Sequence, residues 1–172
     1  MGIENVNNPD TDCLWVVAHT KPRTEKKLAE WCERQGFATT LPVYKSVKKY
    51  PGKTAIFEKP LFPNYLFLKI APHQNRLVYQ SDYVANLLEI GDQTLFERQL
   101  GDILRALETD MEIVLAPQIV AGKRVAVKSG PLRGLEGVVE QRSGRMLVHL
   151  RLDFISQAAA VQIEASELEP LD

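Results

Sequence analysis

Five side chains that are basic or carry an imidazole lie within nine residues near the start of the chain: His19, Lys21, Arg23, Lys26 and Lys27. Side chains of these types bind anions, above all phosphate groups. A helix is expected to open at the nearby proline, and cations at the start of a helix oppose the helix dipole. An external anion is one explanation for this cluster, and a solvated helix face is the alternative.

A second candidate surface lies on the most hydrophobic segment, residues 61–70, which reads LFPNYLFLKI and is predicted to be a strand. Alternation along a strand places Tyr65 and Phe67 on one face and Leu66 and Leu68 on the other. Both faces are largely apolar, so each needs a covering layer from this chain or from another one. An aromatic face of this kind is typical of a surface that receives a partner helix. Core packing is the alternative, particularly for Phe67.

Catalytic chemistry finds little support in the sequence. There are three histidines and two cysteines, Cys13 and Cys32. They do not have the spacing of a metal site or a redox pair, and no nucleophile motif or phosphate-binding loop accompanies them. The sequence predicts no enzyme, no metal and no cofactor. Both cysteines are expected to be buried as small apolar side chains.

The charge of the chain limits how it could hold nucleic acid. The net charge of the 172 residues is −1. Residues 1–60 have 10 Lys and Arg against 7 Asp and Glu, residues 61–116 have 4 against 8, and residues 117–172 have 7 against 7. A protein that binds mainly by neutralising phosphates is usually strongly basic. Any nucleic-acid contact is therefore local, or a protein partner supplies most of the affinity.

The elements expected to position these residues follow from apolar patterning. Residues 14–20 predict a strand, and residues 22–36 a helix closed by a glycine. Residues 39–47 predict extended structure, and residues 46–60 a hairpin or mobile loop around Pro51-Gly52. A short helix at 72–80 and a strand at 84–90 follow. A capping box at Thr94 and Glu97 then opens an amphipathic helix that runs to about residue 108.

The last third of the chain predicts four or five short strands with tight turns and no helical period, which is typical of a small closed barrel. The segment from residue 122 to 139 reads GKRVAVKSGPLRGLEGVV and joins two of these strands through a glycine- and proline-rich loop. The loop residues that could meet a partner are Lys128, Gly130, Pro131, Arg133, Gly134 and Gly137. We predict a disordered leader at 1–12, an α/β sandwich at 13–109, a linker at 110–121 and a barrel at 122–172.

Three stretches of the sequence resemble the NusG family of transcription factors. WVVAHTKPRTEKKLAEWCERQGF resembles the opening strand and helix of the NGN domain of this family, and KPLFPNYLFLKI resembles its FPxY strand. The segment at 122–139 resembles the KOW motif. The resemblance implies an α+β fold, with an NGN α/β sandwich built on an antiparallel sheet and a small SH3-like KOW barrel. General NusG proteins usually have glycine at the position of Asn64, so FPNY favours specialised paralogues of the RfaH type.

The same resemblance implies partners for both candidate surfaces. Tyr65 and Phe67, with Leu87 as a weaker candidate, match the positions that bind the clamp helices of RNA polymerase. The cluster of His19, Lys21, Arg23, Lys26 and Lys27 matches the region that faces the exposed non-template DNA strand. Any preference for a pause sequence would come from base contacts, because phosphate contacts carry no sequence information.

The remaining features have similar implied roles. The lysines of the hairpin would reach across the main channel of the polymerase, or would form a solvated loop. The KOW loop would meet a ribosomal protein, a termination factor or RNA. RfaH has a C-terminal domain that can refold as a helical hairpin, but the strand and turn signals here predict a barrel.

The predicted function is a monomeric transcription elongation regulator that suppresses pausing and termination, as an operon-specific antiterminator. Two alternatives are a general NusG-type elongation or termination factor and a ribosome-associated KOW protein that binds RNA. The near-neutral charge counts against the last of these. The sequence shows no signal peptide and no apolar run of about 18 residues, so a cytoplasmic protein without membrane association is expected.

Overall fold

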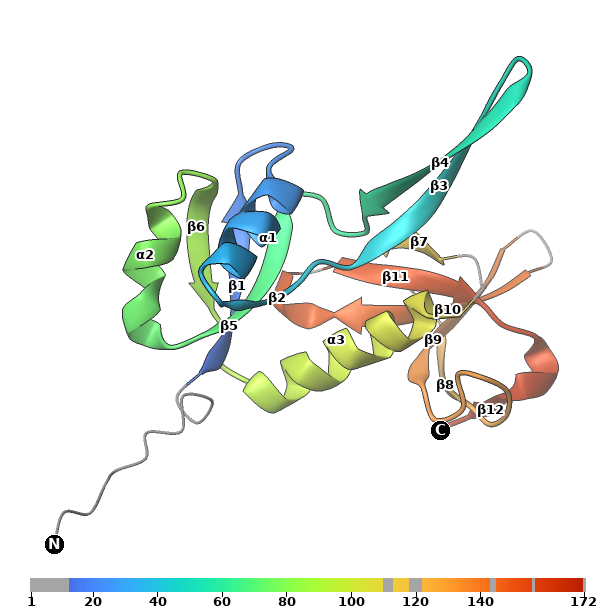
Figure 1. Cartoon of the computed structure of the whole chain (residues 1–172). Coiled ribbons are helices and arrows are strands. Elements are labelled where there is room, and N and C mark those ends of the chain that lie inside the picture. Colours follow the sequence, from blue (N-terminus) through green and yellow to red (C-terminus); the bar gives the residue numbers. More distant parts are fainter. Residues whose placement is uncertain (1–12, 110–112, 118–121, 143–144, 156, 172) are drawn as a thin grey trace, which may run out of the picture. The chain divides into compact units, whose positions relative to one another are not determined.

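The computed structural model describes residues 13–109, 113–117, 122–142, 145–155 and 157–171 (Figure 1). The predicted leader at residues 1–12 lies outside these ranges. The chain divides into two compact units, one of Met1–Leu41 and Pro63–Gln93 and the other of Pro42–Phe62 and Thr94–Asp172. The predicted sandwich at 13–109 contributes to both units, so the domain boundaries stay a prediction.

The first unit is built on a four-stranded antiparallel sheet, as expected for an α+β fold. The strand order is β2-β5-β1-β6, with β2 at Ala38–Thr40, β5 at Tyr65–Ile70, β1 at Leu14–Thr20 and β6 at Val84–Glu89. The two most apolar strands, β1 and β5, lie in the centre because only central strands are shielded on both edges. Edge positions go to the short β2 and the more polar β6.

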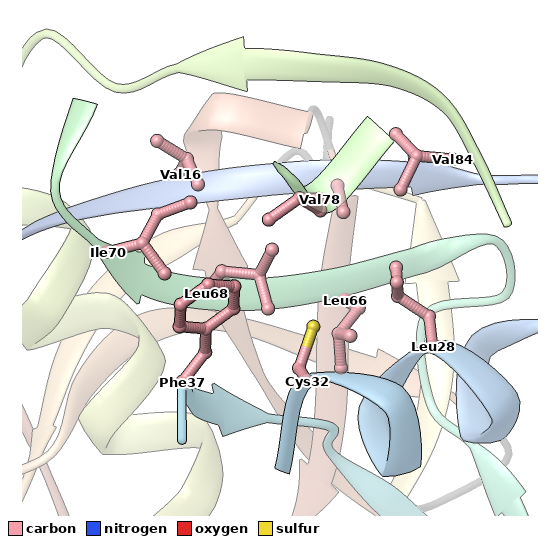
Figure 2. Packing of buried hydrophobic residues seen from close by; sticks show 10 residues of the cluster. Val16, Leu28, Cys32, Phe37, Leu66, Leu68, Ile70, Val78 and Val84 are labelled. Carbon is pink, nitrogen blue, oxygen red and sulfur yellow. The ribbon is translucent and has the colours of Figure 1, made fainter. Parts of the chain in front are cut away.

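One face of this sheet is covered by helix α1 (Glu25–Arg34) and by α2 (Asn75–Tyr79), which follows the 3-10 turn η1 (Pro72–Gln74). Figure 2 shows how Leu66 and Leu68 of β5 meet Leu28 and Cys32 of α1 in this core. All four side chains have no exposed surface. Burying a leucine stabilises a fold by about 1.5–3 kcal/mol, so this apolar cluster holds α1 against the sheet.

Cys32 behaves in this core as a small apolar residue. Burial raises the pKa of its thiol to about 12, because a thiolate would lose its hydration there. The thiol therefore stays protonated and unreactive, as expected for a structural cysteine. Cys13 is partly exposed, so the expectation of burial is confirmed for Cys32 only.

The limits of α1 differ from the prediction at one end. The helix ends as expected, with Gly36 in the left-handed region at φ 78° and the Phe37 N–H donating to the Cys32 carbonyl at 2.9 Å. It begins at Glu25 rather than at Pro22. Lys21 and Arg23 therefore precede the helix, while Lys26 and Lys27 lie in its first turn, where the dipole argument applies most directly.

Strand β5 is shorter than predicted, since it begins at Tyr65 rather than at residue 61. Asn64 has a positive φ of 70° that ends the extended path. Asparagine is one of the few residues besides glycine that adopts this conformation at low cost. The predicted alternation holds from Tyr65 onwards, because Leu66, Leu68 and Ile70 belong to the core under α1.

The second unit contains a two-stranded hairpin of β3 (Val43–Tyr50) and β4 (Lys53–Pro60). The expected turn is present: Pro51 and Gly52 connect the strands, and Gly52 has φ 78°. A two-residue turn with proline first and a left-handed residue second is the type II arrangement. Of the two predicted alternatives, a hairpin and a mobile loop, the structure has a regular hairpin.

Helix α3 (Gln93–Leu107) also belongs largely to the second unit. Its apolar stripe is as predicted, with Phe96, Leu100 and Ile103 buried. The helix begins one residue before Thr94, so Thr94 lies within the first turn and is not the cap residue. The Gln93 side chain bonds instead to the backbone of Trp15, through its Oε1 at 2.7 Å and its Nε2 at 2.8 Å.

A six-stranded antiparallel sheet forms the rest of the second unit. The order is β12-β8-β9-β10-β11-β7, with β12 at Leu168–Pro170, β8 at Lys123–Val127, β9 at Glu136–Arg142, β10 at Arg145–Leu152, β11 at Gln157–Gln162 and β7 at Ile113–Pro117. Short 3-10 turns, η2 (Asp153–Ile155) and η3 (Ala165–Glu167), precede β11 and β12. Val148, Leu150 and Val161 are among its buried residues.

Two observations on the C-terminal part differ from the simplest expectation. The segment 113–117 is not a free linker, because it pairs as β7 with β11. A closed barrel is not found either: over the ranges described above, β12 and β7 are the two edges, and no pairing joins them. The sequence pattern predicts how many strands are present, but it does not show whether the two edge strands of the sheet pair with each other.

Candidate macromolecule-binding site

The two predicted binding surfaces meet at one end of the first unit's sheet. Tyr65 opens β5 and is the cross-strand partner of His19 on β1. Their ring centroids are 5.4 Å apart with an interplanar angle of 31°. His19 is exposed and Tyr65 is half-buried. One aromatic pair therefore joins the predicted polymerase surface to the predicted DNA surface, and we call it the His19–Tyr65 pair.

Phe67 shares the sheet face of Tyr65 but has no exposed surface. It lies opposite Val17 of β1 and Thr40 of β2, in the middle of the sheet. Because α1 and α2 cover the opposite face of this sheet, docking and core packing both stay predictions for Phe67.

Leu87 lies on the opposite face of the sheet from Tyr65 and Phe67. It pairs with Ala18 and packs against the core beneath α1 and α2. Its neighbour Leu88 pairs with Val17 and so shares the face of Phe67. The register of β1 with β6 shifts between His19 and Thr20, and such a bulge cannot be read from the sequence.

The basic cluster is only partly free to bind an anion. Lys21 Nζ lies 2.8 Å from Oδ1 of Asp82, an ion pair between residues 61 positions apart. The hydrogen bond and charge of Lys21 lower the pKa of Asp82, whose side chain is 92% exposed. This carboxylate competes with any phosphate for Lys21, and no local pattern in the sequence predicts the pairing.

Three other members of the cluster lie on the surface. Arg23, Lys26 and Lys27 are exposed, and Arg23 has a positive φ of 62° in the turn before α1. Thr24, the cap position, uses its hydroxyl to donate to the Lys21 carbonyl at 2.7 Å. The turn that carries Lys21 and Arg23 is therefore held by its own hydrogen bonds and needs no ligand to form.

Glu25 is a residue of this site that sequence reasoning missed. Its side chain is buried, and its Oε1 accepts the Asn64 N–H at 2.9 Å. The Asn64 carbonyl in turn accepts the Thr20 N–H at 2.8 Å. Glu25 lies in the first turn of α1, where the helix dipole favours a negative charge. It ties the loop before Tyr65 to the end of β1, and thereby holds the His19–Tyr65 pair in place.

The predicted C-terminal loop connects β8 to β9, and its two leucines are buried. Leu132 and Leu135 are each 1% exposed, while Lys128, Pro131 and Arg133 are exposed. Gly130 and Gly134 take positive φ values of 82° and 93°, which the loop needs for its turns. Three of the predicted contact residues thus point to solvent, and these two glycines shape the loop.

Gly137 has a structural role within β9. A Cβ atom placed there would lie 2.6 Å from the backbone oxygen of His149. Only glycine permits this close approach of two strands. Gly137 therefore belongs to the sheet, and the loop offers Lys128, Pro131 and Arg133 to a partner.

A cavity of about 340 Å³ lies in the second unit. Its lining carries both signs of charge, with Arg98 and Arg124 against Asp102 and Glu136. Burial raises the pKa of Asp102, and Glu136 adds to this effect. Neither sign of charge dominates, so the cavity lacks the selectivity of an anion site. Over the described ranges, no three His, Cys, Asp or Glu side chains group as metal ligands.

The structure is that of a mixed α/β protein that carries an aromatic pair and a basic turn at one end of its first sheet. Residues 14–104 match the family model described as NusG, transcription termination factor NusG. Because this match covers more than half of the 172 residues, the chain belongs to the NusG family.

Membership in the NusG family confirms the general class of protein that the sequence predicted, a transcription factor of this family. Proteins of this family are non-enzymatic transcription elongation and termination factors that bind RNA polymerase. The match includes β1, α1, the β3–β4 hairpin and β5. Within the described part of the chain, no helix has the length and apolarity to cross a membrane.

Proposed function

We propose that this chain is a cytoplasmic monomer that binds elongating RNA polymerase and suppresses pausing and termination. The docking surface would centre on Tyr65 and receive the clamp helices of the polymerase. The adjoining basic residues, His19, Lys21, Arg23, Lys26 and Lys27, would face the non-template DNA strand.

The observation that carries this proposal is the direct contact of His19 with Tyr65. A factor that holds protein and DNA together needs the two surfaces to be continuous. The half-buried ring of Tyr65 offers an aromatic anchor for a partner helix, and such anchors dominate interface energies. The exposed imidazole of His19 lies beside it and can stack on or hydrogen-bond to a base.

The ion pair of Lys21 with Asp82 allows a test with two opposite outcomes. If Lys21 binds a DNA phosphate, Lys21→Gln should weaken recruitment to a paused elongation complex several-fold. Asp82→Asn should strengthen it, because Lys21 then has no competing carboxylate. Asparagine tolerates the positive φ of 66° at position 82, so the backbone should be unaffected. Recruitment is measured by gel shift over a range of salt concentrations.

Arg76→Gln is the matched control for this test, because Arg76 is an exposed cation on α2 of the same unit. It should leave recruitment unchanged. Loss of Lys21 should also reduce the salt slope by about 0.7, the value for one phosphate contact on a single strand. Equal binding by Lys21→Gln, Asp82→Asn and the original chain would show that Lys21 does not touch the DNA.

For the C-terminal unit we propose the KOW role that the sequence suggests. The exposed Lys128, Pro131 and Arg133 on the β8–β9 loop would contact a ribosomal protein, a termination factor or RNA. The buried Leu132 and Leu135 support this assignment, because they keep the loop in one conformation and reduce the entropy lost on binding.

Within the family, we propose that the chain is an operon-specific antiterminator, because its FPNY sequence resembles that of specialised paralogues. A general elongation or termination factor is the second candidate, and the conformation of Asn64 is compatible with it. Its φ of 70° is one that glycine and asparagine both adopt, so FPNY and FPGY can build the same turn.

Polymerase occupancy along the genome of a deletion strain separates these two candidates. A specialised factor should change occupancy within one or a few long operons and leave the rest of the genome unchanged. A genome-wide redistribution of polymerase would contradict the operon-specific role and establish the general one. The strain complemented with the intact gene is the control.

A further inference from the structure

The β3–β4 hairpin has two faces of different chemistry. Residues that pair across the hairpin share a face, and the pairs alternate between the two sides. One side, which we call the aromatic face, contains four consecutive alternate pairs: Tyr44 with Lys59, Ser46 with Phe57, Lys48 with Ala55, and Tyr50 with Lys53. The other side contains the aliphatic pair of Val47 and Ile56.

The turn end of the aromatic face is exposed and its rings already contact cations, whereas Tyr44 and Lys59 at the other end are half-buried. Phe57 is 42% exposed and Tyr50 is 44% exposed. Lys48 Nζ lies 5.7 Å from the Phe57 ring centroid, and Lys53 Nζ lies 5.8 Å from that of Tyr50. Large exposed rings on a two-stranded ribbon do not contribute to a core, so they suggest a surface that binds something else.

Charge on the hairpin is also uneven. The aromatic face has three lysines, Lys48, Lys53 and Lys59, and no acidic residue. The single carboxylate of β3 and β4, Glu58, lies on the other face, opposite Lys45. The aromatic face therefore complements a polyanion, whereas the other face carries charges of both signs.

We propose that the aromatic face of this hairpin binds a single strand of nucleic acid. Bases stack on Phe57 and Tyr50, and Lys48, Lys53 and Lys59 contact phosphates. Aromatic rings interleaved with cations are the general means of binding single strands without sequence preference, because every base has a flat face. This binding goes beyond the docking of Tyr65 on RNA polymerase and does not depend on it.

The ribbon has a suitable length for this role. Successive pairs on one face are about 6.6 Å apart, so the four pairs span about 20 Å. Nucleotides within one strand of a duplex follow each other at about 3.4 Å. The face can therefore accommodate roughly six stacked nucleotides. An acidic protein segment would satisfy the lysines, but it would leave the two exposed rings without a flat partner.

The first test measures stacking with the full-length chain and a fluorescent oligothymidylate of about ten nucleotides, a length within the known range of binding sites. Tyr50→Ile and Phe57→Ile remove the rings but keep apolar strand-forming side chains. Each should weaken binding at least about fivefold, at the lower end for base–aromatic stacking, without changing the salt slope. Val47→Ala with Ile56→Ala, on the opposite face, is the control and should bind unchanged.

The second test measures the phosphate contacts. Lys48→Gln with Lys53→Gln should weaken binding and make the salt slope shallower by about 1.4, the value for two contacts to a single strand. Lys45→Gln with Lys49→Gln makes the same charge change on the other face. It should have a clearly smaller effect on affinity and slope. Amide exchange of the hairpin verifies that every variant keeps its strands.

Three results would overturn the proposal. The isoleucine variants could bind the oligonucleotide as well as the original chain. The two lysine pairs could have equal effects, as for unspecific attraction. A polyglutamate peptide could bind with an affinity that the lysine variants lower and the isoleucine variants do not, which would indicate an acidic protein partner. RNA polymerase is absent from these assays, so their outcome is independent of the proposed function.

Discussion

Replacing Tyr65 by alanine is expected to weaken binding of the full-length chain to isolated RNA polymerase clamp helices by about thirtyfold. Aromatic residues at the centre of an interface often contribute 2 kcal/mol or more, which corresponds to this factor. Tyr65 is half-buried beside His19, so its ring is held in one position before the partner arrives. A side chain ordered in advance loses little entropy on binding. Isothermal titration calorimetry measures the change directly.

Two further variants make this result specific. Tyr65→Phe retains the ring and its contact with His19, so it should bind within a few-fold of the original chain. Tyr79→Ala is the matched control, because Tyr79 is an exposed tyrosine on α2 of the same unit. It loses hydrogen bonds to Leu87 and Asn86 but should leave binding unchanged. Undiminished binding by a folded Tyr65→Ala chain would place the docking surface elsewhere.

The second large effect concerns stability. Phe67→Ala is expected to lower the free energy of unfolding by about 3–5 kcal/mol, the usual cost of truncating a buried phenylalanine. Phe67 has no exposed surface and lies between Val17 and Thr40 in the sheet. Removing the ring leaves a cavity that a central strand cannot close. Urea unfolding followed by tryptophan fluorescence measures the loss, since Trp15 and Trp31 both belong to the first unit.

Leu77→Ala provides the comparison, because Leu77 is 37% exposed on α2 of the same unit. Its removal should change the free energy of unfolding by only about 0.5 kcal/mol. If Phe67→Ala kept its stability but lost affinity for the clamp helices, the original assignment of Phe67 to the docking surface would be right. Loss of stability in Phe67→Ala with normal stability in Tyr65→Ala would assign the two residues to core and surface.

The arrangement around Glu25 explains why Tyr65 can be a surface residue so close to a buried strand. The Glu25 carboxylate, the Asn64 backbone and the Thr20 N–H form one chain of hydrogen bonds. This chain turns the backbone at Asn64 just before β5 begins. Tyr65 consequently lies at the end of the sheet, where one side of its ring meets His19.

Much of the fold was predictable because its signals are local. The stripe of Phe96, Leu100 and Ile103 predicts α3, since apolar residues at helical spacing share one face in any helix. The Pro51-Gly52 pair predicts the hairpin turn, because its conformational preferences match a type II turn. Alternation along residues 65–70 likewise predicts which side chains enter the core under α1.

The tertiary structure decided what depends on residues far apart in the chain. Leu87 lies on the opposite face from Tyr65 because the register of β6 pairs it with Ala18, whose partner on β5 is Leu66. The partial neutralisation of Lys21 depends on Asp82, 61 positions away. The role of Gly137 depends on the approach of the strand that carries His149.

By itself, the sequence indicated the family, most of the helices and strands, and the two surfaces that are candidates for binding. Only the tertiary structure decided that Tyr65 is accessible while Phe67 is buried, and that His19 joins Tyr65 at one end of the sheet. The physical reason is that periodicity and turn preferences are encoded within a few neighbouring residues. Register, close approach and burial are decided instead by the whole set of strands that pack together.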